Sequence, residues 1–217
     1  MKSMKSQQSG FTLVEIAIVL VIIGLLLGGI LKGQELINSA KAKSFAQDFR
    51  TIQTALYGFQ DRYKALPGDF SGTRLTNSII GATSTTVTAT ASNGQIEGAW
   101  DSTSAGDESC LFWQHLRLSG FLAGPTVVDC TAGSDYLQKN ADSGRIGISS
   151  TMNITGMTGS FNICSSGISG KLAKQLDSQL DDGTSTTGSL RIAKLTAPTV
   201  AYTPVLDADA TVVCLAF

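Results

Sequence analysis

Hydrophobic and polar residues follow two successive patterns along the N-terminal third of the chain. Residues 11–31 form a run of apolar and small residues in which Glu15 carries the single charge. About 20 such residues are enough for a helix to cross a bilayer. Beyond Leu31, apolar residues instead recur every three or four positions, which is the period of a helix with one buried face. Together the two patterns predict one continuous helix from Leu13 to Tyr63.

The second half of this helix is predicted to pack under a globular head. Polar residues separate the members of its apolar stripe, which are Phe45, Phe49, Ile52, Leu56, Phe59 and Tyr63. Pro67 and Gly68 come directly afterwards, and both disfavour a continued helix. We therefore expect the helical segment to end at residue 64 and the head to begin at residue 65.

The remaining sequence predicts short strands and two short helices. Residues 70–106 are rich in Ser, Thr, Gly and Ala and are expected to form loops, with an exposed strand or hairpin at residues 85–91. Helices are expected at residues 107–119 and 169–180, and strands around residues 146–154, 160–164, 190–195 and 211–217. This order predicts an α+β fold, with the long N-terminal helix packed on a C-terminal antiparallel β-sheet head.

Glu15 is the residue in the apolar run that needs an explanation, because an ionised carboxylate in hydrocarbon costs about 3 kcal/mol or more. The preceding segment, MKSMKSQQSG, carries two lysines, which favours its retention in the cytoplasm. Cleavage between Gly10 and Phe11 would create an amine four residues before Glu15. That amine on one chain can neutralise Glu15 on a staggered neighbour, so Glu15 is predicted to set the register between subunits.

The residues GFTLVE at positions 10–15, behind their short basic leader, resemble the processing site of type IV prepilins and of the pseudopilins of type II secretion. The resemblance is dense from Gly10 to about residue 40 and thinner beyond. It implies that prepilin peptidase cuts after Gly10, that the new terminal Phe11 is N-methylated, and that Glu15 aligns incoming subunits. A secretory signal peptide would need an A-x-A-like site after the apolar core, and a simple membrane anchor leaves Glu15 unexplained.

The resemblance also implies a division of the chain. Residues 1–10 are a leader that is removed, residues 11–64 are the long N-terminal helix with its transmembrane and assembly part at 11–33, and residues 65–217 are the head. The precursor is expected in the inner membrane of a Gram-negative-type bacterium. Its expected partners are the membrane, prepilin peptidase, the pilus assembly platform and further copies of itself.

One position departs from the family, whose members commonly carry a proline where this chain has Lys32. Four glycines, Gly24, Gly28, Gly29 and Gly33, cluster around this place. Glycine inside a helix is less favourable than alanine by about 1 kcal/mol. Any segment of the helix that melts in a filament is therefore expected between Gly24 and Gly33. The same glycines would equally allow close packing between membrane helices.

Four cysteines lie in the part of the chain that is expected to be exported, where disulfides are stable. Four cysteines allow three pairings. The short separation favours a bond between Cys110 and Cys130, which leaves Cys164 for Cys214. A metal site of cysteines would need close pairs such as C-x-x-C, and the sequence has none.

Few other residues suggest chemistry. Asp177, Asp181 and Asp182 could bind calcium with backbone oxygens, although Asp-Gly is also an ordinary turn sequence. The single histidine, His115, is expected to serve packing or the surface. No nucleophile motif is apparent, so neither enzymatic activity nor a cofactor is expected.

The function expected from this resemblance is that of a type IV pilin, whose filament serves adhesion, motility or DNA uptake. The alternatives are a type II secretion pseudopilin and, in another class, a binding module on a membrane stalk. Charge argues against nucleic acid in general, because 16 basic and 17 acidic residues give a net charge of −1. Losing Lys2 and Lys5 with the leader leaves 14 against 17, a net charge of −3. Conduction through the helix aromatics is also possible in principle, but aromatics at helical spacing usually form core.

Overall fold

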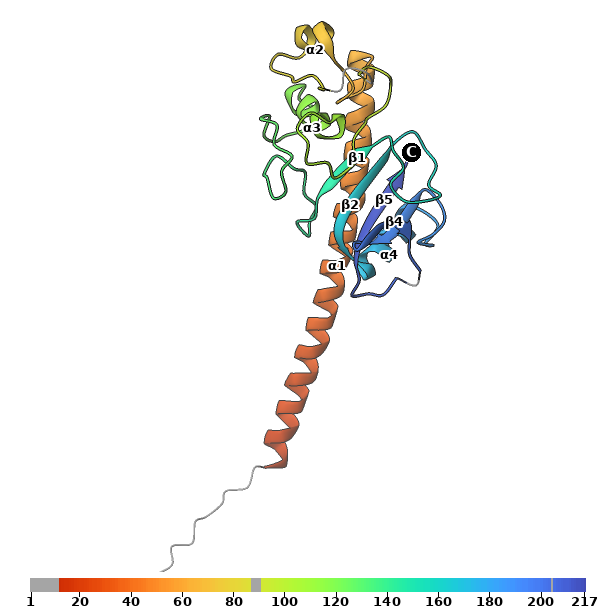
Figure 1. Ribbon diagram of the computed structural model, residues 1–217. Helices are drawn as coiled ribbons and strands as arrows, with labels where there is room; N and C mark the ends of the chain where they lie inside the picture. The colour runs from red at the N-terminus through yellow and green to blue at the C-terminus, as the bar shows by residue number, and fades with distance from the viewer. Residues whose placement is uncertain (1–11, 87–90, 204) are drawn as a thin grey trace, which may run out of the picture. The chain divides into compact units, whose positions relative to one another are not determined.

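A computed structural model describes residues 12–86, 91–203 and 205–217 of the chain (Figure 1). The chain divides into two compact units, Met1–Ala40 and Lys41–Phe217. The first helix, α1 (Leu13–Tyr63), has the predicted bounds and contributes residues to both units.

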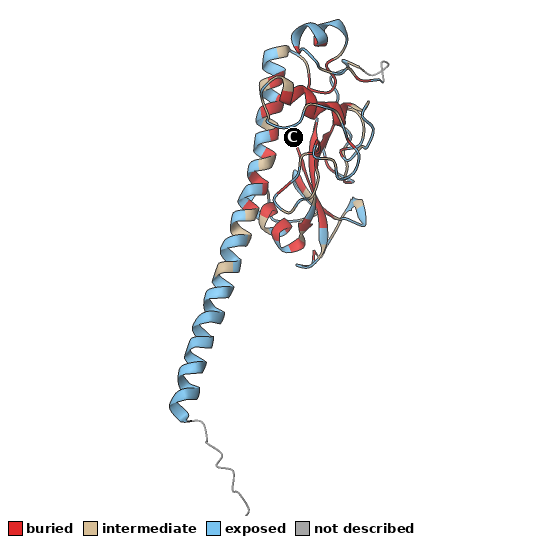
Figure 2. Cartoon of the chain, turned by 90° about the vertical axis from the view of Figure 1, so that its left-hand side faces the viewer, coloured by how far each residue is buried: buried red, intermediate tan, exposed pale blue. Residues whose placement is uncertain are grey.

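In the first unit, α1 is exposed along almost its whole length (Figure 2). Every large apolar side chain from Leu13 to Leu31 has at least 46% of its surface exposed. The helix satisfies its own backbone hydrogen bonds, which is the condition for a single segment to be stable in hydrocarbon. Its large apolar side chains, in contrast, are not buried by any other described residue of the unit.

In the second unit, the rest of α1 forms one wall of the core. Five members of the predicted stripe are confirmed as buried: Phe45, Phe49, Leu56 and Phe59 are at most 1% exposed, and Ile52 is 3% exposed. The sixth, Tyr63, is only partly buried at the edge of the core. Alanines fill the positions beside them, which are Ala42, Ala46 and Ala55. These alanines and the aromatic rings pack into the same hydrophobic core as side chains of the sheet.

The head is built on one antiparallel sheet, so the predicted α+β fold is confirmed (Figure 1). The strands are β1 (Ile146–Ser149), β2 (Asn162–Ser169), β3 (Leu190–Lys194), β4 (Ala197–Ala201) and β5 (Ala210–Ala216). Their order in the sheet is β1-β2-β5-β3-β4, and each neighbouring pair is antiparallel. The last strand of the chain, β5, thus lies in the centre of the sheet.

Both faces of this sheet are covered. Side chains alternate between them, so that Val213 and Leu215 of β5 join the core shared with α1, whereas Val212 and Cys214 join a second cluster. The second cluster is closed by Trp100 and by residues 152–157. Both faces of β5 are buried, which is consistent with its continuous apolar run VVCLA in place of an alternating pattern.

Three further helices complete the head: α2 (Gly72–Ser78), α3 (Glu108–Leu118) and α4 (Gly170–Leu180). The predicted helices at 107–119 and 169–180 are confirmed to within one residue at each end, as are strands β3 and β5. The sequence did not suggest α2, whose residues are mostly Gly, Thr and Ser, or β4. Strand β4 contains Pro198, which a strand tolerates at the edge of a sheet.

Two strand predictions had the wrong extent. Strand β1 ends at Ser149 instead of residue 154, because the Ser149 hydroxyl accepts the Thr151 N–H at 3.0 Å and the chain turns there. Strand β2 was placed at 160–164 but spans Asn162–Ser169. Its polar side chains form hydrogen bonds with a neighbouring loop: the Ser165 hydroxyl accepts a hydrogen bond from the Asn140 side-chain amide at 2.8 Å. Most of the strand or hairpin expected at 85–91 lies outside the described residues.

Candidate functional site

The first turn of α1 contains the candidate assembly site. Gly10 and Phe11 lie outside the described residues, so the site is visible from Thr12 onward. Thr12 precedes the helix and Glu15 is its third residue. The Glu15 carboxylate oxygen Oε2 accepts the Thr12 N–H and the Thr12 hydroxyl, both at 2.8 Å. In return, the Glu15 N–H donates to the Thr12 hydroxyl at 3.3 Å.

This reciprocal pair is a capping box, in which the residue before a helix and its third residue satisfy each other's backbone N–H groups. The sequence predicts a partner for Glu15 on another chain, and the structure shows this further partner within the same chain. The pattern T-x-x-E directly before an apolar run was the signal that would have identified it. Within the described residues, no donor reaches the other carboxylate oxygen, Oε1. The carboxylate can therefore cap its own helix and accept a second donor at the same time.

The surface around this site is apolar on every side. α1 is long and apolar enough to cross a membrane, and none of its most hydrophobic 18-residue window is buried in the structure. A surface of this size in a soluble protein would mark an interaction site. Such an apolar surface can be covered by lipid, by neighbouring helices, or first by one and then by the other.

The helix is continuous through the four glycines that were expected to loosen it. A Cβ atom built on Gly24, Gly28, Gly29 or Gly33 would have no neighbour within 4 Å. The glycines therefore have no packing role within a single chain. Melting between Gly24 and Gly33 stays a prediction for the assembled state.

The cysteines pair as predicted, Cys110 with Cys130 and Cys164 with Cys214. The second bond joins directly opposed residues of neighbouring strands β2 and β5, whose Cα atoms are 4.1 Å apart. The first ties α3 to the loop that follows it, across a sequence separation of 20 residues. Both bonds therefore lie in the head.

His115 has a structural role, in agreement with the prediction that it serves packing. Its ring is fully buried, and Nδ1 accepts the Gly68 N–H at 2.9 Å. The second nitrogen, Nε2, lies 2.9 Å from the Thr83 carbonyl oxygen, to which it donates in the neutral tautomer. His115 thus holds two loops against α3, and burial lowers its pKa to about 4.

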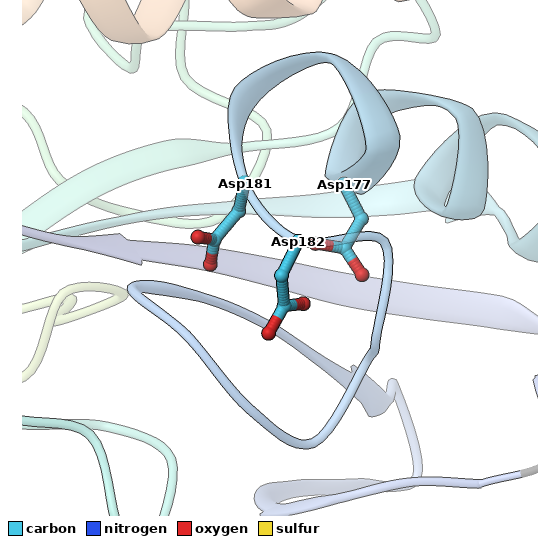
Figure 3. A group of neighbouring side chains, drawn as sticks. All are labelled: Asp177, Asp181 and Asp182. Atoms are coloured by element: carbon cyan, nitrogen blue, oxygen red, sulfur yellow. The ribbon is translucent and has the colours of Figure 1, made fainter.

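The three candidate calcium ligands come together at the end of α4. One carboxylate oxygen from each of Asp177, Asp181 and Asp182 lies within 4.8 Å of the others. Figure 3 shows the three side chains projecting from the last turn of α4 and the loop after it. Burial, together with the nearby charges of Asp182 and Asp181, raises the pKa of Asp177 to about 6.

A cavity of about 420 Å³ opens in the second unit beside the end of α1. Its acidic residue, Asp69, uses both carboxylate oxygens to hold a loop, accepting the N–H groups of Asn93 at 3.0 Å and Gly94 at 2.9 Å. Its Arg74 donates to the Tyr63 carbonyl at 3.1 Å. These charged groups maintain local structure, so the cavity does not by itself favour the binding-module alternative.

Comparison with known proteins places the N-terminal residues in a defined class. Residues 5–31 match the family model of the prokaryotic N-terminal methylation motif. No curated protein and no solved structure matches the chain. The matched range contains the predicted cleavage junction, the capping box and most of the exposed apolar helix. The chain therefore carries the signature of type IV pilins and pseudopilins, a structural and not an enzymatic class of proteins.

Proposed function

We propose that this chain is a structural subunit of a type IV pilus, which polymerises through α1 into an extracellular filament. The observation that carries the proposal is the exposed apolar surface of α1 with a single acid in its first turn, inside a matched methylation motif. The precursor waits in the inner membrane of a Gram-negative-type cell. Prepilin peptidase removes residues 1–10 and Phe11 is methylated, after which the assembly platform extracts the subunit.

The chemistry of assembly is an exchange of neighbours around α1. In the membrane its apolar side chains face lipid, and in the filament they face other copies of the same helix. Lipid tails are as apolar as leucine, so hydrophobicity alone gives little preference for either environment. Pairing of a buried charge does favour the filament over the lipid, because an unpaired acid in hydrocarbon costs about 3 kcal/mol or more. Glu15 supplies the acid and the new terminus of a neighbour supplies the amine.

Two features support a pilin over a type II secretion pseudopilin. Removing ten residues from 217 leaves 207, which is long compared with the major pseudopilins that the sequence resembles. The head also carries two disulfides. Crosslinks of this kind typically stabilise a domain by about 2–4 kcal/mol, which suits a fibre exposed to shear and proteases.

The capping box allows a test that separates the charge of Glu15 from its effect on the helix. Glu15→Gln keeps a side-chain acceptor at the third helix position, where glutamine also completes a capping box. Thr12→Ala removes the cap and keeps the acid. We expect Glu15→Gln to insert and mature normally but to yield few filaments, and Thr12→Ala to assemble. Glu35→Gln is the matched control, since Glu35 is an exposed acid on the same helix, paired with Lys32 at 2.7 Å.

The readouts are the mass of the mature chain and the quantity of filament sheared from cells. Normal filament yield from Glu15→Gln would contradict the register role of the charge. Loss of filaments from Thr12→Ala alone would assign Glu15 to helix capping instead.

Mass spectrometry and imaging of sheared surface fibres address the type of filament. If this chain is the bulk component of the fibres, it is a major pilin. If fibres never form and loss of the chain stops protein secretion, the pseudopilin alternative replaces the proposal.

A further inference from the structure

Asp177 has an environment that a carboxylate rarely occupies without a partner. It lies in the last turn of α4 with 1% of its surface exposed. Within the described residues, no donor makes a hydrogen bond of normal distance and angle to either carboxylate oxygen. The Gly183 N–H is near enough only to offset part of the rise in the pKa of Asp177. Buried polar groups in proteins are nearly always hydrogen-bonded, and buried charges are nearly always paired. A buried carboxylate of this kind is therefore suited to hold a cation.

The loop after α4 supplies further oxygens at the same place. We propose that Asp177, Asp181 and Asp182 bind a calcium ion, independently of the type of filament to which the chain belongs. Ca²⁺ binds its oxygen ligands at about 2.4 Å, so two ligands of one ion lie at most about 4.8 Å apart. Oxygens from all three side chains meet this limit (Figure 3).

Two of the carboxylates are already oriented by the loop. The Leu190 N–H donates to Asp181 Oδ2 at 2.7 Å, which leaves Asp181 Oδ1 available. Asp182 accepts the Thr184 N–H at 2.7 Å and the Thr187 hydroxyl at 2.6 Å. A carboxylate oxygen has more than one lone pair, so these bonds do not prevent coordination. They hold the ligands in place before the ion arrives, which reduces the entropy cost of binding.

No described lysine or arginine side chain forms an ion pair with these three aspartates. Among the ion pairs of residues 12–86, 91–203 and 205–217, none involves any of the three aspartates. Arg191 is near enough to lower the pKa of Asp182, but its Nη1 donates to the Thr155 carbonyl at 3.0 Å. Its guanidinium thus anchors a different loop, and Asp177 is left without a counter-charge.

The ligand set favours calcium over other metals. All three side chains offer oxygen, and zinc sites characteristically include nitrogen or sulfur ligands. Magnesium demands an almost ideal octahedron at about 2.1 Å, whereas calcium accepts irregular sets of six to eight oxygens. Backbone carbonyls and water would complete the coordination. Extracellular calcium modules bind with dissociation constants of about 0.1–1 mM.

The test is calcium binding by the full-length chain in detergent after treatment with a chelator. Calcium at 100 times its dissociation constant is expected to raise the melting temperature by about 5–10 °C. Isothermal titration should give one ion per chain. Asp177→Asn should abolish the response, and Asp182→Asn, at an exposed position, should weaken it. The matched control is Asp61→Asn, which changes an exposed acid on α1.

The alternatives give different results. Melting that does not respond to calcium up to about 10 mM, well above the range for extracellular modules, would overturn the proposal. An equal response in the wild type and in both site variants would also overturn it, because the ion would then bind elsewhere. Magnesium that acts as well as calcium would refute the assignment of the metal.

Discussion

Replacing His115 should change how the stability of the head depends on pH. His115 lies on α3 with its ring fully buried, and both ring nitrogens are engaged. Nδ1 accepts the Gly68 N–H, so a proton added there would face another donor. The neutral ring is thus favoured by burial and by the hydrogen bond from Gly68, whereas the Thr83 carbonyl acts in the opposite direction and raises the pKa of His115. Burial lowers the pKa of His115 from 6.5 to about 4.

The size of the effect follows from the difference between the two pKa values. The unfolded chain binds a proton near pH 6.5 and the folded chain only near pH 4, so acid favours the unfolded state. The contribution of neutral His115 is complete above pH 6.5 and is lost as the pH falls towards 4. One pKa unit corresponds to about 1.4 kcal/mol, which gives a loss of about 2 kcal/mol at pH 5 and about 3 kcal/mol in total.

Other buried groups change the stability with pH in the opposite direction, and the experiment has to remove their contribution. Burial and neighbouring carboxylates raise the pKa of Glu108 to about 7, and burial raises the pKa of Asp48 to about 6. These acids stabilise the fold as the pH falls, which is opposite in sign to His115. We therefore compare the wild type with His115→Gln, because the acids contribute equally to both proteins and drop out of the difference.

The assay is urea unfolding of the full-length protein in detergent at pH 8 and at pH 5. Trp113, which is 1% exposed and lies on the same helix, reports unfolding by its fluorescence. His115→Gln should be less stable than the wild type at pH 8, and the gap should narrow by about 2 kcal/mol at pH 5. A gap that stays constant between the two pH values would refute the assignment of a buried neutral ring.

Three further predictions concern processing and packing. Gly10→Ala should block maturation, because it alters the junction inside the matched motif, and a normal yield of mature chain by mass spectrometry would contradict this. Changing Cys164 and Cys214 together to serine should lower the free energy of unfolding by about 2–4 kcal/mol in urea. An unchanged midpoint would show that the crosslink between β2 and β5 is dispensable. Gly147→Ala should cost about 1–3 kcal/mol by overpacking, since its Cβ would collide with the Trp100 carbonyl. Unchanged thermal melting would show that the chain relaxes there at no cost.

Local patterns were sufficient to predict the parts of this protein that depend on neighbours in the sequence. The bounds of α1 and its buried stripe follow from apolar spacing, and the stop follows from Pro67 and Gly68. The predicted processing junction and Glu15 lie close together in the sequence, and the matched motif at residues 5–31 covers both of them. Helices α3 and α4 carry the same kind of periodic signal. The disulfide pairing was also accessible, because loop length favoured the shorter link.

Contacts between distant residues required the tertiary structure. The length of β2 depends on hydrogen bonds from a loop more than twenty residues earlier in the chain, and α2 and β4 have too little periodicity to stand out. The neutral state of His115 depends on its burial and on the Gly68 N–H, which lies 47 residues away in the sequence. The environment of Asp177 likewise depends on which donors of the folded head lie within hydrogen-bonding reach of its carboxylate. Periodicity reports which side chains face a core. Which buried polar atoms form hydrogen bonds is decided only by the tertiary structure. Their partners lie in segments far away in the sequence, and no local pattern indicates which segments come together.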